Sequence, residues 1–421
     1  MTATVACVLR SGGEYTQRDV QWLWNSVRAN LRGVKFFCLS DTPVPSPRVD
    51  LRYKWPGWWS KMELFRPDLP PGDLLYLDLD TVVTGTLLHL AGARELTMLS
   101  DFYHLARPAS GLMLIPHSER AAIWEAWMRD PAGIMKVCQA FDVNGVRGDG
   151  KFLGELVGGR AKRWQDLFPG EVVSYKVHVR KAKIPPREVG TGSVPPGANV
   201  VCFHGKPRPS ELAERWIKEA RLDWSGETIF LIGGGPSAGQ IDLERLRGRG
   251  RVIAINDSAK KLPWADAVFT IDDSWVSRRA DFLRTFAGRK IFAVQPGFRL
   301  PPGVDGELLE RIDAGGALSN DPMRIVMGFN SGFGAINLAA SRGAKRIVLI
   351  GYDMDQTNPQ THWHGGYEWK CRFGRNDYPD WAAGISNLAP ALARMKVDVV
   401  NLNPQSAIKA FRFATLDQVL N

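Results

Sequence analysis

Cysteine is scarce in this sequence, with five in 421 residues and none in a C-x-x-C arrangement. They are Cys7, Cys38, Cys138, Cys202 and Cys371. An odd number of scattered cysteines argues against a disulfide framework and against a thiolate zinc site. We therefore expect reduced, mostly buried thiols.

Long hydrophobic runs and repeats are also missing. No stretch approaches the roughly 18 apolar residues that a membrane span requires, and the first residues, MTATVACVLRSGG, have neither a basic leader nor a long apolar segment. No period of about 20 to 50 residues is visible, which argues against solenoids and propellers. We expect a protein of the cytoplasm without a membrane span or signal peptide.

Acidic residues are outnumbered by basic ones, 44 to 54, giving a net charge of +10. This balance suits an anionic ligand such as a sugar nucleotide, and it also permits contact with nucleic acid. The densest basic stretch contains His178 and five basic residues, Lys176, Arg180, Lys181, Lys183 and Arg187. A solvated face is the alternative explanation for it.

The chain is long enough for two cores, and apolar runs alternate with helical patterns throughout, which predicts an α/β fold. In the first half, strands are expected at 4–9, 35–40, 73–80, 96–101, 110–116 and 199–205, with helices at 17–31, 118–130 and 209–224. A second series of strands is expected at 228–232, 251–257, 266–272, 290–295, 345–353 and 398–404. We predict two domains, 1–224 with a mixed sheet and 225–421 with a Rossmann-like doubly wound sheet.

A carboxylate pair marks the end of one expected strand. In YLDLDTVV, Asp78 and Asp80 are separated by one residue, so the alternation of a strand points both side chains to the same side. Two carboxylates so placed favour a hard divalent cation, Mn²⁺ or Mg²⁺, that also bridges to phosphates. A solvated strand end is the alternative for a D-x-D pair alone.

The surrounding sequence resembles the GT-A glycosyltransferases, especially the glycogenin-like group known as family 8. The likeness covers roughly residues 1–210 and rests on the Tyr-Leu-Asp-x-Asp strand and on VCFHGKPRP, residues 201–209. It implies that Asp78, Asp80 and His204 hold a metal and that Lys206 contacts the diphosphate of a nucleotide-sugar. A structural histidine is the alternative for His204.

Other residues match this family less closely. Ser110 and Gly111 resemble the strand lining the sugar pocket, and Asp149 lies where the family often has an Asp-Gln pair, here Asp-Gly. Lys61 is a candidate for phosphate or sugar hydroxyls, and Trp58 or Trp59 for stacking on an acceptor or for packing in the core.

A glycine-rich turn follows the first strand of the second half. Gly233, Gly234, Gly235, Pro236 and Ser237 are expected to turn the chain and present backbone N–H groups to an anion. The run is neither GxGxxG nor a P-loop, so it specifies no NAD or nucleoside triphosphate. A plain strand-to-helix turn is the alternative.

The second half resembles a group that spans bacterial family 42 sialyltransferases, archaeal pterin diphosphokinase-like proteins and phage proteins of unassigned role. The likeness covers roughly residues 227–413 and rests on the glycine turn, NSGFGAINLAASRGAKRIVLIGYDM, HWHGG and NLNPQSAIKAF. It implies a nucleotide site made of Gly233, Gly235, Pro236, Ser237, Asn256, Asp257, Asn330, Ser331, Gly332 and Ser406. His362, with His364 in reserve, would be catalytic, since an imidazole can move a proton near neutral pH; a surface loop is the alternative.

Together these patterns predict a metal-dependent glycosyltransferase with Asp149, Lys206 and His362 as catalytic candidates. A bifunctional enzyme, in which both halves bind nucleotides, is an open alternative. The acceptor is a glycan, a protein or modified DNA, in a phage or in its bacterial host. Two other readings stay open. One is a sialyltransferase-like or diphosphokinase-like second half beside an inactive first half, and the other is a non-catalytic phage structural or morphogenesis protein.

Overall fold

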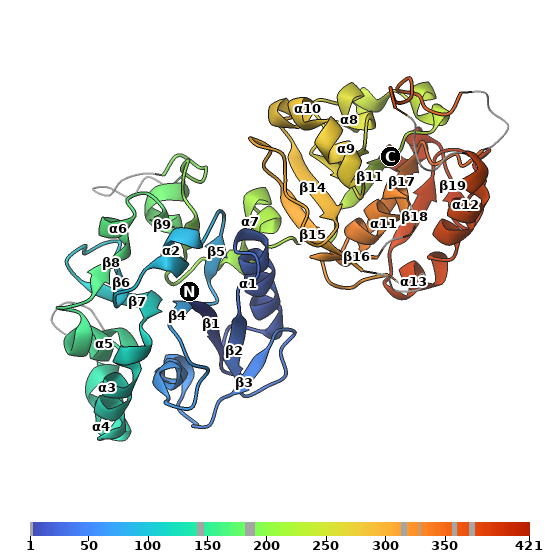
Figure 1. Cartoon of the computed structure of the whole chain (residues 1–421). Coiled ribbons are helices and arrows are strands. Elements are labelled where there is room, and N and C mark those ends of the chain that lie inside the picture. Colours follow the sequence, from blue (N-terminus) through green and yellow to red (C-terminus); the bar gives the residue numbers. More distant parts are fainter. Residues whose placement is uncertain are drawn as a thin grey trace. The chain divides into compact units, whose positions relative to one another are not determined.

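The computed structural model describes residues 3–140, 147–181, 190–312, 318–326, 328, 330–355, 360–369 and 375–421. The chain divides into two compact units, Met1–Leu222 and Asp223–Asn421, coloured blue to green and green to red (Figure 1). The sequence patterns predict this division between residues 224 and 225. Of the residues singled out above, Lys183, Arg187 and Cys371 lie outside the described ranges.

The first unit is built on a mixed sheet of seven strands in the order β3-β2-β1-β4-β7-β6-β8. Strands β1, β2, β3 and β4 run parallel, and β7 is antiparallel to both β4 and β6. The bounds are β1 Thr4–Leu9, β2 Phe36–Ser40, β3 Arg48–Asp50, β4 Leu74–Leu77, β6 Thr97–Ser100, β7 Pro108–Ile115 and β8 Lys162–Arg163. The expected mixed sheet is confirmed.

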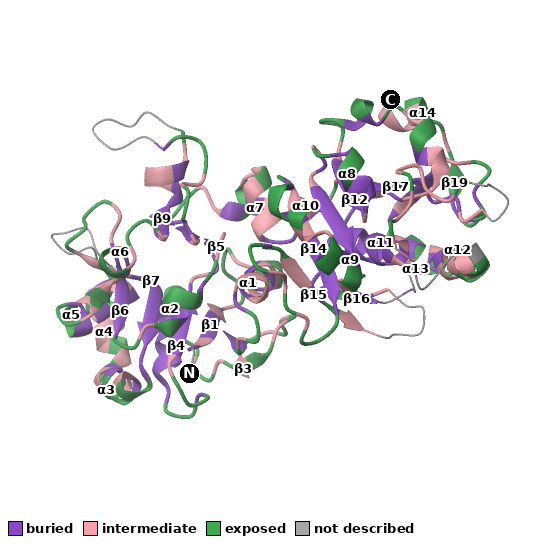
Figure 2. Ribbon diagram, turned by 45° about the horizontal axis from the view of Figure 1, so that its top comes forward, coloured by how far each residue is buried: buried purple, intermediate pink, exposed green. Residues whose placement is uncertain are grey.

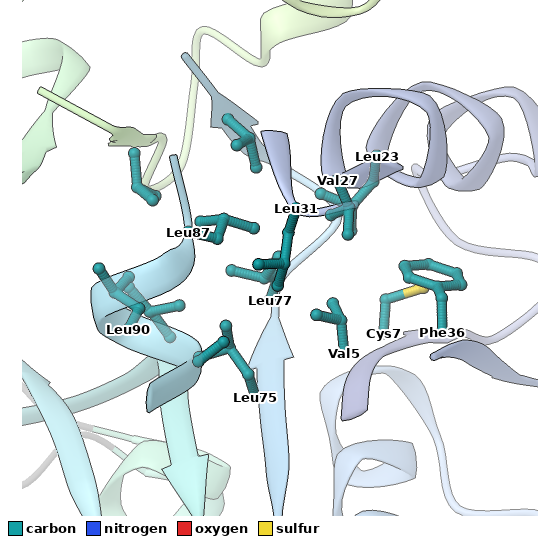
Figure 3. Close-up of a cluster of buried hydrophobic side chains, with 14 of the residues drawn as sticks. Val5, Cys7, Leu23, Val27, Leu31, Phe36, Leu75, Leu77, Leu87 and Leu90 are labelled. Atoms are coloured by element: carbon teal, nitrogen blue, oxygen red, sulfur yellow. The ribbon is translucent and has the colours of Figure 1, made fainter. Parts of the chain in front are cut away.

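Alternation along the central strands buries both faces of this sheet. Val5 and Cys7 of β1 and Leu77 of β4 pack with Val27 of helix α1 (Gln17–Asn30), as Figure 3 shows. The intervening residues of the same strands, such as Tyr76, join a second cluster on the other face. Thr16 and Asp19 form a capping box that starts α1.

Shorter helices complete the first unit. They are η1 Gly57–Phe65, α2 Leu88–Gly92, α3 His117–Met128, α4 Pro131–Gln139, α5 Asp149–Val157, α6 Trp164–Leu167, η2 Tyr175–Val179, η3 Pro209–Glu211 and α7 Arg215–Ala220. A small sheet, β5-β10-β9, joins β5 Thr81–Val83 to β10 Val200–Cys202 and β9 Val172–Ser174. It brings the segments that follow β9 and β10 to the carboxylate pair that precedes β5.

The second unit is built on nine strands in the order β16-β15-β14-β13-β12-β11-β17-β18-β19, all parallel. The bounds are β11 Thr228–Ile232, β12 Arg251–Ile255, β13 Ala267–Thr270, β14 Arg289–Val294, β15 Glu307–Ile312, β16 Arg324–Val326, β17 Arg346–Ile350, β18 Asp398–Asn401 and β19 Arg412–Phe413. The strand order reverses between β11 and β17, so the expected doubly wound, parallel sheet is confirmed.

Buried strands and more exposed helices distinguish the interior of this unit from its surface (Figure 2). The helices are η4 Pro236–Gln240, η5 Leu243–Leu246, α8 Ser258–Lys261, α9 Asp273–Arg278, α10 Ala280–Thr285, α11 Ser331–Ser341, η6 Arg375–Asp377, α12 Tyr378–Ser386, α13 Ala389–Arg394 and α14 Leu416–Leu420. No helix in the described part of the chain is long and apolar enough to cross a membrane.

Some expected elements differ from those observed. The helix expected at 209–224 is reduced to η3 and α7, because residues 212–214 between them are extended or irregular. Strands β15 and β16 were not expected, since β15 reads ELLERI with few buried positions and β16 has three residues. Cys7, Cys38, Cys138 and Cys202 are buried free thiols, as expected.

Candidate functional sites

The carboxylate pair lies where the strand order of the first sheet reverses. Strand β1 has β2 on one side and β4 on the other, and both are parallel to it. The segments that leave the carboxyl ends of β1 and β4 therefore diverge and leave a crevice, where ligands of α/β proteins bind. Tyr15 follows β1, and Asp78 and Asp80 follow β4, which places all three at this edge.

Asp78 is tied to a buried lysine. The Lys61 ammonium, on η1, lies 3.4 Å from Asp78 Oδ1 and 2.9 Å from Asp149 Oδ2. Burial alone would lower the pKa of Lys61, but the charges of Asp149 and Asp78 raise it well above its usual value. Lys61 is therefore a permanent cation at the centre of the site.

The pocket strand β7 contributes to the same network. Ser110 Oγ donates to Asp149 Oδ2 at 2.7 Å and lies 3.3 Å from Lys61 Nζ. A Cβ added at Gly111 would approach Asp78 Oδ2 to 3.2 Å, so glycine leaves the space that this carboxylate takes. Lys61, Ser110, Gly111 and Asp149, separated by up to 88 positions (149 − 61), thus lie together around Asp78.

Asp80 has different partners. Its Oδ2 accepts a hydrogen bond from the Tyr15 hydroxyl at 2.9 Å and another from the Arg208 guanidinium. Burial and the charge of Asp78 raise the pKa of Asp80 to about 7, against the opposing effect of Arg208. The site therefore holds two close carboxylates whose ionisation opposes one another.

The structure does not assemble the expected metal ligands into one group. His204 Nε2 hydrogen-bonds with Ser174 Oγ at 2.7 Å, and its ring stacks on Phe102. Among the described residues, no three His, Cys, Asp or Glu side chains are arranged to hold a metal ion. Burial and the charge of Lys176 lower the pKa of His204 to about 4, so the imidazole is neutral at physiological pH.

Lys206 and the two candidate tryptophans differ in how far they are buried. The Lys206 side chain is 69% exposed and pairs with Glu211 at 3.1 Å. Trp59 is buried against Trp127, so its role is in the core, whereas Trp58 is exposed.

The second sheet has its own reversal, between β11 and β17, and there the structure contains a cavity of about 800 Å³. Its wall is formed at the carboxyl ends of β11, β12, β13 and β17, the position expected for a ligand in a doubly wound sheet. Eight of the expected residues line it, namely Gly233, Gly235, Pro236, Asn256, Asn330, Ser331, Gly332 and His362.

Three backbone amides of the glycine turn are already engaged. The N–H of Gly233 donates to Ile350, that of Gly235 to Gly351, and that of Ser237 to the Asp353 carboxylate at 2.8 Å. A Cβ at Gly235 would lie 2.7 Å from Asp353 Cγ. The turn thus accommodates a carboxylate of the protein itself, and the phosphate contact expected there stays a prediction.

Three expected residues, Ser237, Asp257 and Ser406, lie outside the cavity lining. Asp257 accepts hydrogen bonds from Trp275 Nε1 and from Arg279, and Ser406 Oγ donates to the Tyr352 carbonyl at 2.6 Å. Both side chains are buried, and the nucleotide contact expected of them stays a prediction. Asn330 caps α11, and Ser331 lies within 3.4 Å of the Asn256 amide oxygen.

His362 and His364 lie side by side, with ring centroids 4.9 Å apart. Burial lowers the pKa of His362, and burial with the charge of His362 lowers that of His364 to about 4. Of the two histidines, only His362 lines the cavity of about 800 Å³, so it is the better placed for proton transfer.

Sequence reasoning missed several charged or polar residues. Tyr15 and Arg208 contact Asp80. Arg311 and Asp273 line the cavity of the second unit as an ion pair 3.2 Å apart. Arg208 stood within the VCFHGKPRP motif and could have been found there. Arg311 carried no signal, because its strand was not expected.

No known family model matches the sequence, and no curated protein is significantly similar to it. Among solved structures, it is similar to the glycosyltransferase GlyE of Streptococcus pneumoniae TIGR4, at 12% identity over 73% of this chain and 95% of GlyE, with a TM-score of 0.37. It is also similar to the galactosyltransferase LgtC in complex with donor and acceptor sugar analogues, at 13% identity over 52% of this chain and 95% of LgtC, with a TM-score of 0.35. A third similar structure is the bifunctional glycosyltransferase WbbM, at 10% identity over 52% of this chain and 49% of WbbM, with a TM-score of 0.37. Likenesses at this level assign no activity to the chain.

Proposed function

We propose that the chain is a glycosyltransferase that moves a sugar, most simply a hexose, from a nucleotide-sugar to a hydroxyl of an acceptor. The observation that carries this proposal is the convergence of Asp78, Asp80, Lys61 and Asp149 at the reversal point of the first sheet. Lys61 holds two carboxylates at fixed positions, which is the preorganisation that a sugar and a diphosphate require.

The chemistry divides among these groups. The bond between the anomeric carbon and the diphosphate oxygen breaks, and its electron pair stays on the diphosphate. The acceptor oxygen forms the new bond to the anomeric carbon, and its proton passes to a carboxylate, to the leaving diphosphate or to solvent. Asp149 and Ser110, joined by a 2.7 Å hydrogen bond that the Ser110 hydroxyl donates, are placed to accept hydrogen bonds from sugar hydroxyls.

The donor set fits a divalent cation in part. Asp78 and Asp80 supply hard oxygen ligands. Burial, and then the charge of Asp78, raises the pKa of Asp80, and a cation would offset the repulsion between the two carboxylates. They would hold Mn²⁺ or Mg²⁺, which would neutralise the diphosphate. His204 is neutral and chemically able to join them, and its role as third ligand stays a proposal.

Donor hydrolysis tests the proposal. Purified full-length protein is incubated with UDP- and GDP-hexoses, with and without Mn²⁺, and the released nucleoside diphosphate is measured. We expect release by the wild type, its loss in Asp80→Ala, and its retention in His362→Ala. Loss only in His362→Ala would move the active centre to the second unit, and no release from the wild type would favour a non-catalytic protein.

A second candidate function belongs to the second unit, where the cavity of about 800 Å³ is large enough for a nucleotide. We propose that it binds a nucleotide or the acceptor, with His362 as proton-transfer group if this unit is a transferase. Thermal-shift titration with CMP, UDP, GTP and ATP tests this, and a ligand that protects the wild type but not Gly235→Ala supports it.

Modified DNA is the acceptor for which the chain's charge argues. The net charge of +10 predicts duplex binding that weakens steeply with salt. Absence of binding at low salt would leave a glycan or a protein as the acceptor.

A further inference from the structure

Two cations other than Lys206 flank the carboxylate edge of the first unit. Lys206, which the motif singles out, is exposed and paired with Glu211. Lys176, on η2, instead donates from Nζ to the carbonyl of His204. Lys176 is thereby held against the backbone of the same His-Gly-Lys-Pro segment.

Gly205 makes this placement possible. Its φ of +73° lies in the left-handed region, and a Cβ there would come within 3.3 Å of Lys176 Nζ. Glycine therefore allows both the turn and the close approach of the lysine.

Arg208 is the second cation. Its guanidinium donates to Asp80 Oδ2 through one nitrogen and to Glu14 Oε2 through two others, at 3.1 and 2.8 Å. It also lies over the Tyr15 ring, 5.1 Å from the ring centroid. The Arg208 side chain is 20% exposed, so the guanidinium that neutralises Asp80 can also be reached from solvent.

Several cations gather around these groups. Lys176, Arg180 and Arg208 lie close enough for their charges to act on one another. The Arg208 guanidinium faces the carboxylates of Asp80 and Glu14, and the Glu211 carboxylate accepts from its backbone N–H. A cluster of mutually repelling cations beside a partly open carboxylate edge favours a multivalent anion.

We infer that Lys176 and Arg208 bind the diphosphate of the nucleotide that leaves during transfer. This inference rests on the proposed function and names the cations of that site. When the bond to the anomeric carbon breaks, the electron pair left on the diphosphate oxygen adds one negative charge. Lys176 and Arg208 stabilise that charge by charge-assisted hydrogen bonds.

The test compares nucleotides that differ by one phosphate. Isothermal titration measures the affinity of the full chain for UDP and UMP, and for GDP and GMP, in the wild type and in Lys176→Met. We expect Lys176→Met to weaken diphosphate binding by about 10-fold or more, because it removes a hydrogen-bonding cation, and to change monophosphate binding by less than about 3-fold. Lys162→Met, on β8, is the control because it removes the same charge at an exposed position.

Arg208 needs a separate pair of variants, because its removal leaves Asp80 without a counter-charge. Arg208→Lys keeps the charge and Arg208→Gln removes it, and thermal unfolding checks that both fold. We expect diphosphate affinity to fall in the order wild type, Arg208→Lys, Arg208→Gln. Equal diphosphate affinity in Lys176→Met, Lys162→Met and the wild type would overturn the inference, and so would equal losses for diphosphate and monophosphate. A wild type that binds no nucleoside diphosphate would refute the proposed function itself.

Discussion

At the carboxyl edge of the first sheet, Lys61 and Arg208 already neutralise the carboxylates of Asp78, Asp149 and Asp80. At the equivalent edge of the second sheet, a cavity of about 800 Å³ remains, and its glycine turn surrounds Asp353 with backbone amides. The two units thus place a site at the same topological position with different contents. The first is a dense network of charges suited to exchanging one ion partner for another, and the second is a space suited to a whole nucleoside or sugar.

Removing the central cation of the first site has the largest expected effect. Lys61→Met leaves Asp78 and Asp149 without their counter-charge, and breaking a buried ion pair costs about 3–5 kcal/mol. Hydrogen exchange measures this loss of stability in each unit separately. We expect faster exchange for the amides of β4 and an unchanged rate for those of β11. The double variant Lys61→Met with Asp149→Asn is the matched control and should recover part of the loss. Equal protection of β4 in Lys61→Met and the wild type would show that the network is not held by charge.

Closing the second site has the next largest effect. In Gly235→Ala, the new Cβ lies 2.7 Å from Asp353 Cγ and from the Gly351 carbonyl oxygen, so the backbone of the turn must shift, at a cost of about 1–3 kcal/mol. We expect faster exchange in β11 and loss of ligand protection. Gly111→Ala is the counterpart in the first unit, and it should cost less because it meets a single carboxylate oxygen at 3.2 Å. The reverse order would contradict the description of the second site as the more tightly built turn.

The sequence predicted what local pattern determines. Apolar runs located the central strands, and the spacing of Asp78 and Asp80 placed both at one strand end. The partners of these carboxylates depend on tertiary contacts between distant segments, so neither Tyr15 nor Arg208 was recognised. In the second unit, the glycine turn predicted the cavity wall. The Asp353 carboxylate, which accepts a hydrogen bond from the Ser237 amide, lies 116 positions further along the chain and has no local signal.

The two sites are also expected to respond to pH with opposite sign. Burial raises the pKa of Asp80 to about 7 from 3.8, so the folded state binds its proton more tightly and loses stability as pH rises from about 4 to 7. Burial lowers the pKa of His364 from 6.5 to about 4, so the unfolded state binds that proton more tightly and stability falls as pH drops from about 6.5 to 4.

Urea unfolding of metal-free protein with two variants separates these effects. Asp80→Asn should raise the unfolding midpoint relative to the wild type more at pH 8 than at pH 5. His364→Phe should raise it more at pH 4.5 than at pH 7.5. Parallel pH profiles for both variants and the wild type would contradict the expected difference between the two sites in their response to pH.

The smallest effect is expected at Lys206, which tests whether burial or motif membership decides the role of a lysine. Its side chain is 69% exposed and its partner Glu211 is 41% exposed, so solvent screens the pair and lysine loses side-chain freedom to form it. Lys206→Ala should therefore leave the hydrogen exchange of β10 unchanged, while Lys61→Met accelerates that of β4. Faster exchange in β10 would mean that Lys206 helps to neutralise the buried carboxylates, and the network around Asp80 would then extend to the surface of the first unit.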